Sequence, residues 1–241
     1  MPSIRGTGQQ ASSASSYVVP WPSGTIAGDF AVIYCGHAWP ANLPSGWMEN
    51  DNQAGSNWNG AVFSKRLSTT DITAGSVTVT FSGGFNGTLA ILTTIGDASV
   101  KKTDAIRNSS GSSSVTVSSS VAAATTDLLS YFGSNRAAST NTVSRGALQR
   151  QVNDGSNASG CLYTETGVSG TVSPNFLYST PGSGNYQAIV LLGDPAVVTA
   201  SRITAPAIGS GAGAKHQPVT APSTTGIPAP PTTGGNAGWS S

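Results

Sequence analysis

Charge is what this sequence has least of. Lysine and arginine number 11 and aspartate and glutamate 10, and together they make up 9% of the 241 residues, about a third of the usual share. The net charge of +1 provides no strong field that would attract nucleic acid or an anionic membrane surface. Basic residues adjoin only at Lys65-Arg66 and Lys101-Lys102. We therefore expect neither nucleic acid nor a membrane as a partner.

Long apolar runs and cysteines are also scarce. The N-terminal residues MPSIRGTGQQASSASS contain no apolar stretch of signal-peptide length, and no later run is long enough to span a bilayer. We therefore expect the protein to be made and assembled in a cytoplasm. Cys35 and Cys161 both lie in apolar, strand-like runs. Two buried free thiols are the expected arrangement in a reducing compartment, and a disulfide is the less favoured alternative.

Glycine, serine, threonine and valine are abundant, and they form short alternating runs. In SVTVTFS at 76–82, the apolar residues share one face and the hydroxyl residues the other, which predicts a half-buried strand. No segment keeps a 3.6-residue apolar stripe. The pattern predicts an all-β fold, a single antiparallel two-sheet sandwich of about ten strands and jelly-roll-like. The expected strands are 17–20, 28–37, 60–67, 76–82, 88–95, 114–118, 127–132, 144–151, 160–165, 171–178 and 185–192.

Two apolar runs that end in Gly-Asp indicate an internal correspondence. They are TLAILTTIGDAS at 88–99 and YQAIVLLGDPA at 186–196, and each follows a strand that begins with aspartate. Asp29 and Asp97 are 68 positions apart, and Asp127 and Asp194 are 67 apart. Because each half offers only about four expected strands, we interpret the halves as matching parts of one sandwich. Whether a duplication produced them stays open.

The first two hundred residues resemble a β-sandwich domain of tailed-phage virion proteins and related phage-derived particles. The resemblance rests on SGTIAGDFAVIY, LPSGW, GAVFSKRLSTTDI and VTVTFSGGFNGTLAILTTIGDAS in the first half, and on TTDLLSYFG and YQAIVLLGDPA in the second. One departure is that NTVSRGALQRQ lacks the Pro/Gly-Trp element that the family often repeats. The resemblance implies a non-enzymatic decoration, fibre or minor tail protein, located in the virion. It also implies several copies, for which a trimer is a frequent arrangement.

Motifs for catalysis, cofactors or metals are missing. The sequence has no G-x-S-x-G elbow, no phosphate-binding loop and no cluster of metal ligands. Cys35 and His37 would suit a nucleophile and a base, but a structural histidine is the favoured interpretation. Glu49 and Asp51 could form a weak cation site, against which a solvated loop is favoured. We predict no catalytic residues, no metal and no cofactor.

The segment HAWPANLPSGWMENDNQAGSNWNG is the best candidate for a binding site. It contains three tryptophans, and Asn57 and Asn59 flank the last of them. Aromatic faces beside amide groups suit stacking on sugar rings, so a host-surface carbohydrate or receptor site is the alternative function. The competing interpretation is that the tryptophans plug the end of the sandwich or contact a neighbouring subunit. The tryptophans are Trp39, Trp47 and Trp58.

After Val198 the composition changes to proline, threonine, alanine, glycine and serine. Such a segment cannot bury enough apolar surface to fold alone, so we expect a β-sandwich domain at 1–198 and an extended arm at 199–241. Isolated apolar residues of the arm are predicted to dock on other virion proteins or on further copies of this chain. They are Ile203, Ile208, Val219, Ile227 and Trp239.

Overall fold

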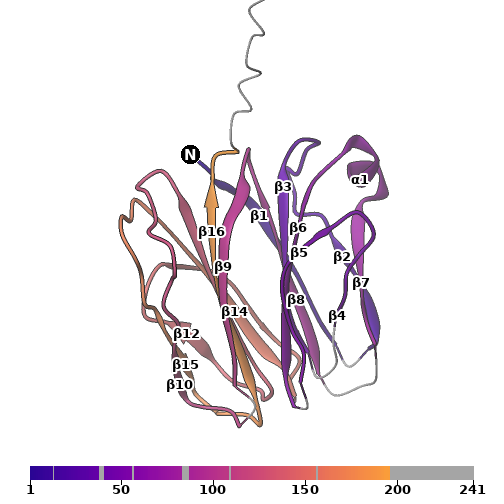
Figure 1. The fold of residues 1–241 in the computed structure, drawn as a ribbon. Coiled ribbons are helices and arrows are strands. Elements are labelled where there is room, and N and C mark those ends of the chain that lie inside the picture. Colours follow the sequence, from indigo (N-terminus) through magenta and orange to yellow (C-terminus); the bar gives the residue numbers. More distant parts are fainter. Residues whose placement is uncertain are drawn as a thin grey trace, which may run out of the picture. The chain divides into compact units, whose positions relative to one another are not determined.

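The structure is a computed structural model. A compact unit spans Met1–Val198, and its described residues form sixteen strands and one short helix (Figure 1). All strand pairs in the sheets are antiparallel. The prediction of an all-β antiparallel sandwich is therefore confirmed. The structure describes residues 1–12, 14–37, 41–55, 57–82, 87–108, 110–155 and 157–195.

The first half of this unit contains eight strands in two sheets. The larger sheet has the order β1-β8-β3-β6-β5 and the smaller the order β2-β7-β4. Successive strands mostly alternate between the two sheets, as in a jelly roll. The elements are β1 (Ile4–Ser12), β2 (Ser16–Pro20), β3 (Phe30–His37), β4 (Ala41–Asn42), β5 (Met48–Gln53), β6 (Asn59–Arg66), α1 (Thr69–Ala74), β7 (Ser76–Phe81) and β8 (Thr88–Ile95).

The second half repeats this arrangement strand by strand. Its larger sheet has the order β9-β16-β11-β14-β13 and its smaller sheet the order β10-β15-β12. Each strand thus takes the place of the strand eight numbers earlier, and α1 alone has no counterpart among the described residues. The strands are β9 (Ser99–Asn108), β10 (Ser114–Thr116), β11 (Leu128–Asn135), β12 (Asn141–Val143), β13 (Ala147–Asn153), β14 (Ser159–Thr166), β15 (Asn175–Tyr178) and β16 (Asn185–Gly193).

The irregularities of the edge strands are repeated too. The register of β1 against β8 shifts at Arg5, and that of β9 against β16 shifts at Lys101. In the same way β5 has an extra residue at Asn50, and β13 has one at Gln149. A bulge interrupts the ladder and turns the edge of a sheet away from further pairing. Matching bulges in matching strands show that the two halves are an internal structural repeat.

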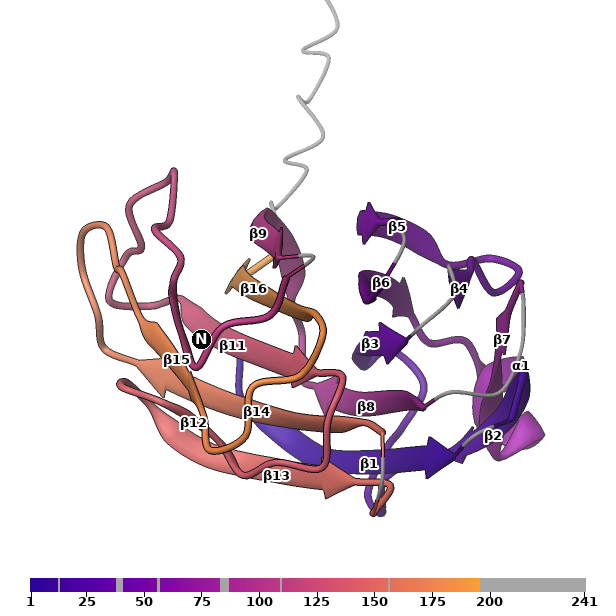
Figure 2. The ribbon, with the colours of Figure 1, turned by 90° about the horizontal axis from the view of Figure 1, so that it is seen from below.

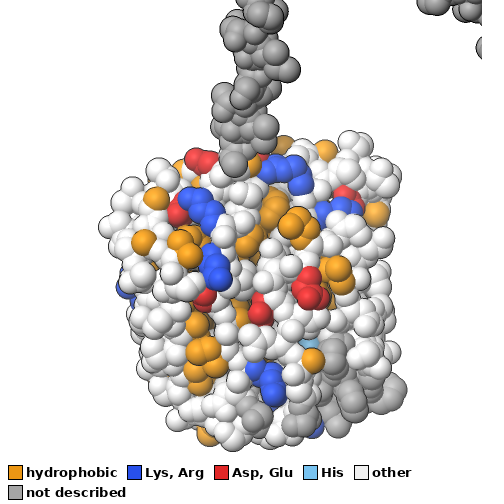
Figure 3. All heavy atoms as spheres, viewed as in Figure 1, with side chains coloured by type: hydrophobic (Ala, Val, Ile, Leu, Met, Phe, Trp, Pro, Cys, Tyr) orange, Lys and Arg blue, Asp and Glu red, His pale blue; other side chains and the backbone are white. Residues whose placement is uncertain are grey.

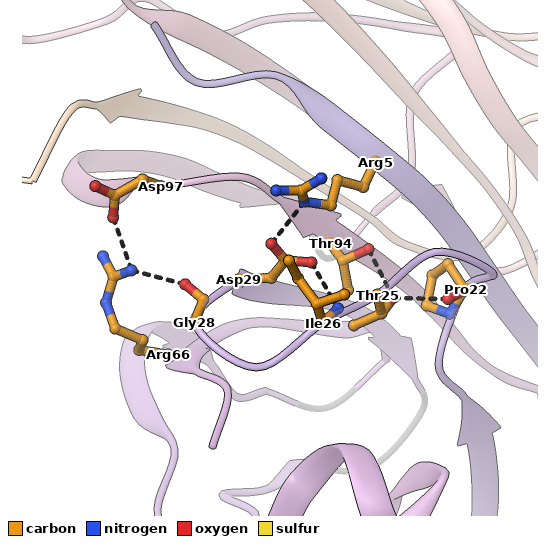
Figure 4. A network of polar contacts seen from close by, with 9 residues as sticks. All are labelled: Arg5, Pro22, Thr25, Ile26, Gly28, Asp29, Arg66, Thr94 and Asp97. Carbon is orange, nitrogen blue, oxygen red and sulfur yellow. Dashed lines mark hydrogen bonds and ion pairs between the residues drawn. The ribbon is translucent and has the colours of Figure 1, made fainter. Parts of the chain in front are cut away.

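The bulged residues explain why each half has a strand that begins with aspartate. Arg5 Nε donates a hydrogen bond to Asp29 Oδ1 at 2.6 Å, and Lys101 Nζ lies 2.5 Å from Asp127 Oδ1. Both carboxylates are 2% exposed, and the other oxygen of each accepts a backbone N–H three residues earlier. Figure 4 shows the first of these networks. The aspartates therefore tie the edge strand to the turn before the third strand of each half.

The four sheets are stacked face to face. The two five-stranded sheets lie in the middle and the two three-stranded sheets lie outside them (Figures 1 and 2). Across the middle, β1 lies beside β13 and β5 lies beside β9. Since β13 corresponds to β5 and β9 to β1, the contact between the halves is self-complementary, like that of a two-fold symmetric dimer.

Three apolar cores fill the spaces between the four sheets. The middle core joins both halves and includes Tyr34, Trp58, Phe132 and Tyr186. The second core lies within the first half and the third core within the second half. Each is built on the faces of the central strands that point away from the middle core. This corrects the expectation of a single two-sheet sandwich of about ten strands, in which neither half has a core of its own. Strands with both faces buried, such as β3 and β11, are the consequence.

Two glycines allow the halves to approach closely. A Cβ atom at Gly60 would overlap the ring of Tyr186, and one at Gly160 would lie 2.9 Å from Leu89 Cδ1. The glycines take equivalent places in β6 and β14, and Tyr186 and Leu89 take equivalent places in β16 and β8. Each half therefore offers a gap in its sheet to a large side chain of the other half.

The strands that the sequence did not predict are mainly edge strands. Strands β1, β5 and β9 have no regular apolar alternation. Their residues are exposed or partly buried, and each of these strands lies beside an edge strand of the other half. Helix α1 was also not predicted, since it is six residues long and has no buried residue. Its N-terminus is fixed by a capping box between Ser68 and Asp71, and Gly75 ends it with a φ of 74°.

Candidate functional site

The possible nucleophile and base lie inside the protein. Cys35 and His37 are on β3 and have no exposed surface. The ring of His37 packs on that of Phe81, with centroids 5.0 Å apart, and burial raises the pKa of the Cys35 thiol. No substrate can reach either side chain in this arrangement. Their positions support a role in packing.

The second cysteine lies in the equivalent cross-strand pair of the other half, but on the opposite strand of that pair. Cys35 pairs with Ala61 across β3 and β6, and Cys161 pairs with Gly133 across β14 and β11. Each outer core therefore contains one cysteine sulfur at this cross-strand pair. It comes from β3 in the first half and from β14 in the second. Both cysteines are free and buried, as predicted. Burial raises the pKa of Cys161 to about 12.

The acidic pair of β5 is engaged with neighbouring polar groups. Asp51 Oδ2 accepts a hydrogen bond of 2.7 Å from Tyr186 Oη, and Glu49 Oε2 accepts one of 3.0 Å from Asn52. Burial raises the pKa of Asp51, and hydrogen bonds from Tyr186 and Gln53 partly offset this. Within the described ranges there is no group of three potential metal ligands. Asp51 thereby links β5 to β16 of the other half, whereas Glu49 is paired within β5.

The predicted aromatic site is not assembled on the surface by the residues that the structure describes. Trp58 and Asn59 have no exposed area, Trp47 is 7% exposed and Asn57 is partly buried. Trp39 lies outside the described residues. A ring must show a face to solvent to stack on a sugar, and neither described tryptophan does so. Their burial favours the competing interpretation as packing residues.

Trp58 fastens the first half to the second. Its Nε1 donates a hydrogen bond of 3.0 Å to Ser134 Oγ on β11, and its backbone oxygen accepts one from Arg107 on β9. The neighbouring Asn57 oxygen accepts a hydrogen bond from Arg136. The turn before β6 is thus held by two arginines of the other half. The second half has Ala158 in the matching GSN-x-x-G sequence, so this contact is made once.

Trp47 belongs to a corner that sequence patterns did not reveal. Its ring stacks on Trp21, with centroids 6.5 Å apart and planes inclined by 15°. Trp21 Nε1 donates to the backbone oxygen of Asp71 in α1, and Lys65 Nζ lies 2.6 Å from the Asp71 carboxylate. The equivalent register position of Trp21 in the second half is Ser119. The only signal in the sequence was a second tryptophan in VPWPSG, 26 residues before Trp47.

The predictions for the C-terminal arm and for the protein family are not tested by the described residues. The five apolar residues of the arm, Ile203, Ile208, Val219, Ile227 and Trp239, lie outside the described residues. No helix in the described part is long and apolar enough to cross a membrane. No protein-family model, curated protein or solved structure matches the chain.

Proposed function

We propose that the protein is a structural component of a tailed-phage virion or a related particle, such as a decoration, fibre or minor tail protein. It is present in several copies and acts without catalysis. The proposal combines the resemblance of the first two hundred residues with a property of the structure. Side chains that could do chemistry, such as Cys35, His37 and Asp51, are taken up by packing or by the contact between the halves.

The observation that carries this proposal is the four-layer stack itself. Three cores and a self-complementary middle contact connect two sandwiches into one unit, with ion pairs at the buried carboxylates of Asp29 and Asp127. In such a unit most side chains pack in a core or lie on the outer surface, so the unit is rigid. A rigid unit suits a building block of a particle. The segment after Val198 provides a docking arm in this proposal, because its composition suits extended binding across a partner.

The test is the composition of purified particles from cells that make this chain. Quantitative mass spectrometry should find the full chain in the particle fraction, in several copies per particle. Replacing Ile203, Ile208 and Ile227 together by aspartate should remove it from particles, while the circular dichroism of the purified chain stays unchanged. A chain that remains in the soluble fraction in the presence of intact particles contradicts the proposal.

A second candidate function, binding of a host-surface carbohydrate, is favoured by one observation. The Trp21–Trp47 pair has no counterpart among the described residues of the second half, and Trp21 is partly exposed. A glycan array probed with the full chain and with Trp21→Ala tests this. Loss of binding by Trp21→Ala at a temperature where circular dichroism shows the variant to be folded supports it, and absence of binding by the original chain contradicts it.

A further inference from the structure

The two outer sheets differ from the rest of the surface in having no charge. The strands β2, β4, β7, β10, β12 and β15 contain no lysine, arginine, aspartate or glutamate. The exposed edge strands of the inner sheets, in contrast, all carry charged residues: Arg5 on β1, Asp51 on β5, Lys102 on β9 and Arg150 on β13. A soluble surface normally has about 25–35% charged residues. In this chain, of which charged residues make up 9%, the two outer sheets are the ones whose strands carry no charge at all.

The residues that point outward from these sheets form matching rows. In the first half Ser16, Thr80 and Asn42 lie side by side across the three strands. In the second half Ser114, Leu177 and Thr142 form the equivalent row. A second row pairs Val18 with Thr78 and Thr116 with Asn175. Val18 is 54% exposed and Leu177 41%.

Burying these faces would cost little free energy. Serine, threonine and valine have few rotamers to lose, whereas an ordered lysine or arginine side chain loses up to about 2 kcal/mol of rotamer entropy. No charge would have to leave water. Several of the polar groups are already paired on the surface, as in Asn42 Nδ2 to Thr80 Oγ1 at 3.1 Å and Ser114 Oγ to Asn175 Oδ1 at 2.9 Å.

We propose that the outer sheet β2-β7-β4 of one copy docks face to face on the outer sheet β10-β15-β12 of a second copy. A charged partner such as nucleic acid or an acidic protein would find no counter-charge on either sheet. The chain itself offers the fitting partner, a second uncharged sheet, and the two sheets lie on opposite outer faces of the described unit (Figures 1 and 2). Most of the charged side chains visible in Figure 3 lie over the central strands, and others lie near α1 and at the left edge of the view.

Contact between unlike faces on opposite sides adds copies in a row, because each added copy leaves one sheet of each kind free. In the central row of this contact Leu177 of one copy would meet the flat row of Ser16, Thr80 and Asn42 of the next. The strands of the smaller of these sheets have three or four residues, so the three together cover on the order of 150–200 Å². A stable pair of proteins usually buries about 800 Å² on each partner. The contact is therefore weak in solution and becomes effective where many copies are held close together.

This inference names a partner for the assembly proposed above, but its test needs only the purified full chain. Sedimentation velocity from about 1 µM to about 1 mM should show an average mass that rises with concentration. Thr78→Lys and Leu177→Lys each place an ammonium group in the centre of one face, and each should lower the association constant at least tenfold. Gln149→Lys adds the same charge at the partly exposed bulge of β13, outside both faces, and should associate like the original chain.

Mixing the two face variants gives the sharpest result. Thr78→Lys leaves β10-β15-β12 intact, and Leu177→Lys leaves β2-β7-β4 intact, so a mixture should form one-to-one pairs that grow no further. Two monomeric variants that remain monomeric when mixed overturn the proposal. So does self-association that is unaffected by either lysine, because it must then use another surface. Neither outcome affects the presence of the chain in particles, which tests the proposed function separately.

Discussion

Tyr34 and Phe132 occupy the same place in the two halves, and their rings meet each other in the middle core, with centroids 5.5 Å apart. Next along the same strands, Gly36 faces Ser134, the residue equivalent to it. Equivalent residues can touch only at a symmetry axis, so the pseudo-two-fold axis passes between β3 and β11. The protein is therefore built like a dimer whose two subunits are joined in one chain.

The buried aspartates are expected to be essential to each half. Asp29→Ala should lower the free energy of unfolding by about 2–4 kcal/mol, because Arg5 and a backbone N–H lose their acceptor. Asp127→Ala should have a similar effect through Lys101. Urea denaturation measures both. Asp97→Ala is the control, since its ion pair with Arg66 is exposed and should contribute less than about 1 kcal/mol.

The gap at Gly60 should not tolerate a methyl group. Gly60→Ala would push the added Cβ into the ring of Tyr186 and is expected to cost about 1–3 kcal/mol or more. Thermal unfolding checks this, with Gly96→Ala as a control at a position where the nearest atom is 3.9 Å away. The double variant Gly60→Ala with Tyr186→Leu should recover part of the loss. If Gly60→Ala alone is as stable as the original, the close packing of the halves is not as described.

Asp51 should make stability depend on pH in a defined direction. Its pKa is raised in the folded protein, mainly by burial, so folding favours the protonated form. Its contribution to stability is present below the pKa of the unfolded chain and is lost as the pH rises through the raised value. Asp51→Asn should therefore be more stable than the original at pH 7, and the difference should disappear in acid. Denaturation at several pH values measures this, and a variant that is less stable at pH 7 contradicts it.

The two thiols should be inert in the native state. Burial raises the pKa of both Cys35 and Cys161, so almost no thiolate exists at pH 8 and no reagent reaches the sulfur. Ellman's reagent should modify neither cysteine in native protein within an hour and both at once in guanidinium chloride. A fast native reaction of one equivalent would identify an accessible thiol and contradict the buried position.

The corner at Trp21 should matter more for local than for global structure. Trp21→Ala removes the stacking partner of Trp47 and the hydrogen bond to the Asp71 oxygen, so α1 loses its anchor. We expect a red shift of tryptophan emission and faster amide exchange in 68–75, with a loss of about 2–4 kcal/mol in stability. Unchanged exchange in this helix would show that Lys65 and the capping box hold it alone.

Local patterns were sufficient for the central strands and the class of fold. Alternation in 76–82 and the apolar run at 28–37 mark strands because side-chain direction alternates along any strand, whatever surrounds it. Strands β1, β5 and β9 escaped detection, since their residues face a bulge, a rim or solvent and so follow no fixed period. The equal spacing of Asp29–Asp97 and Asp127–Asp194 indicated matching halves but not their number of strands.

The sequence by itself determined an all-β protein with two corresponding halves, two free buried cysteines and a change of composition after Val198. The tertiary structure alone decided that each half is a complete sandwich and that the halves face each other across an axis. It also placed Trp58 in the middle core, where its indole N–H reaches Ser134, 76 positions away. The physical reason is that burial of a tryptophan depends on which surface folds over it, and that surface comes from a distant part of the chain.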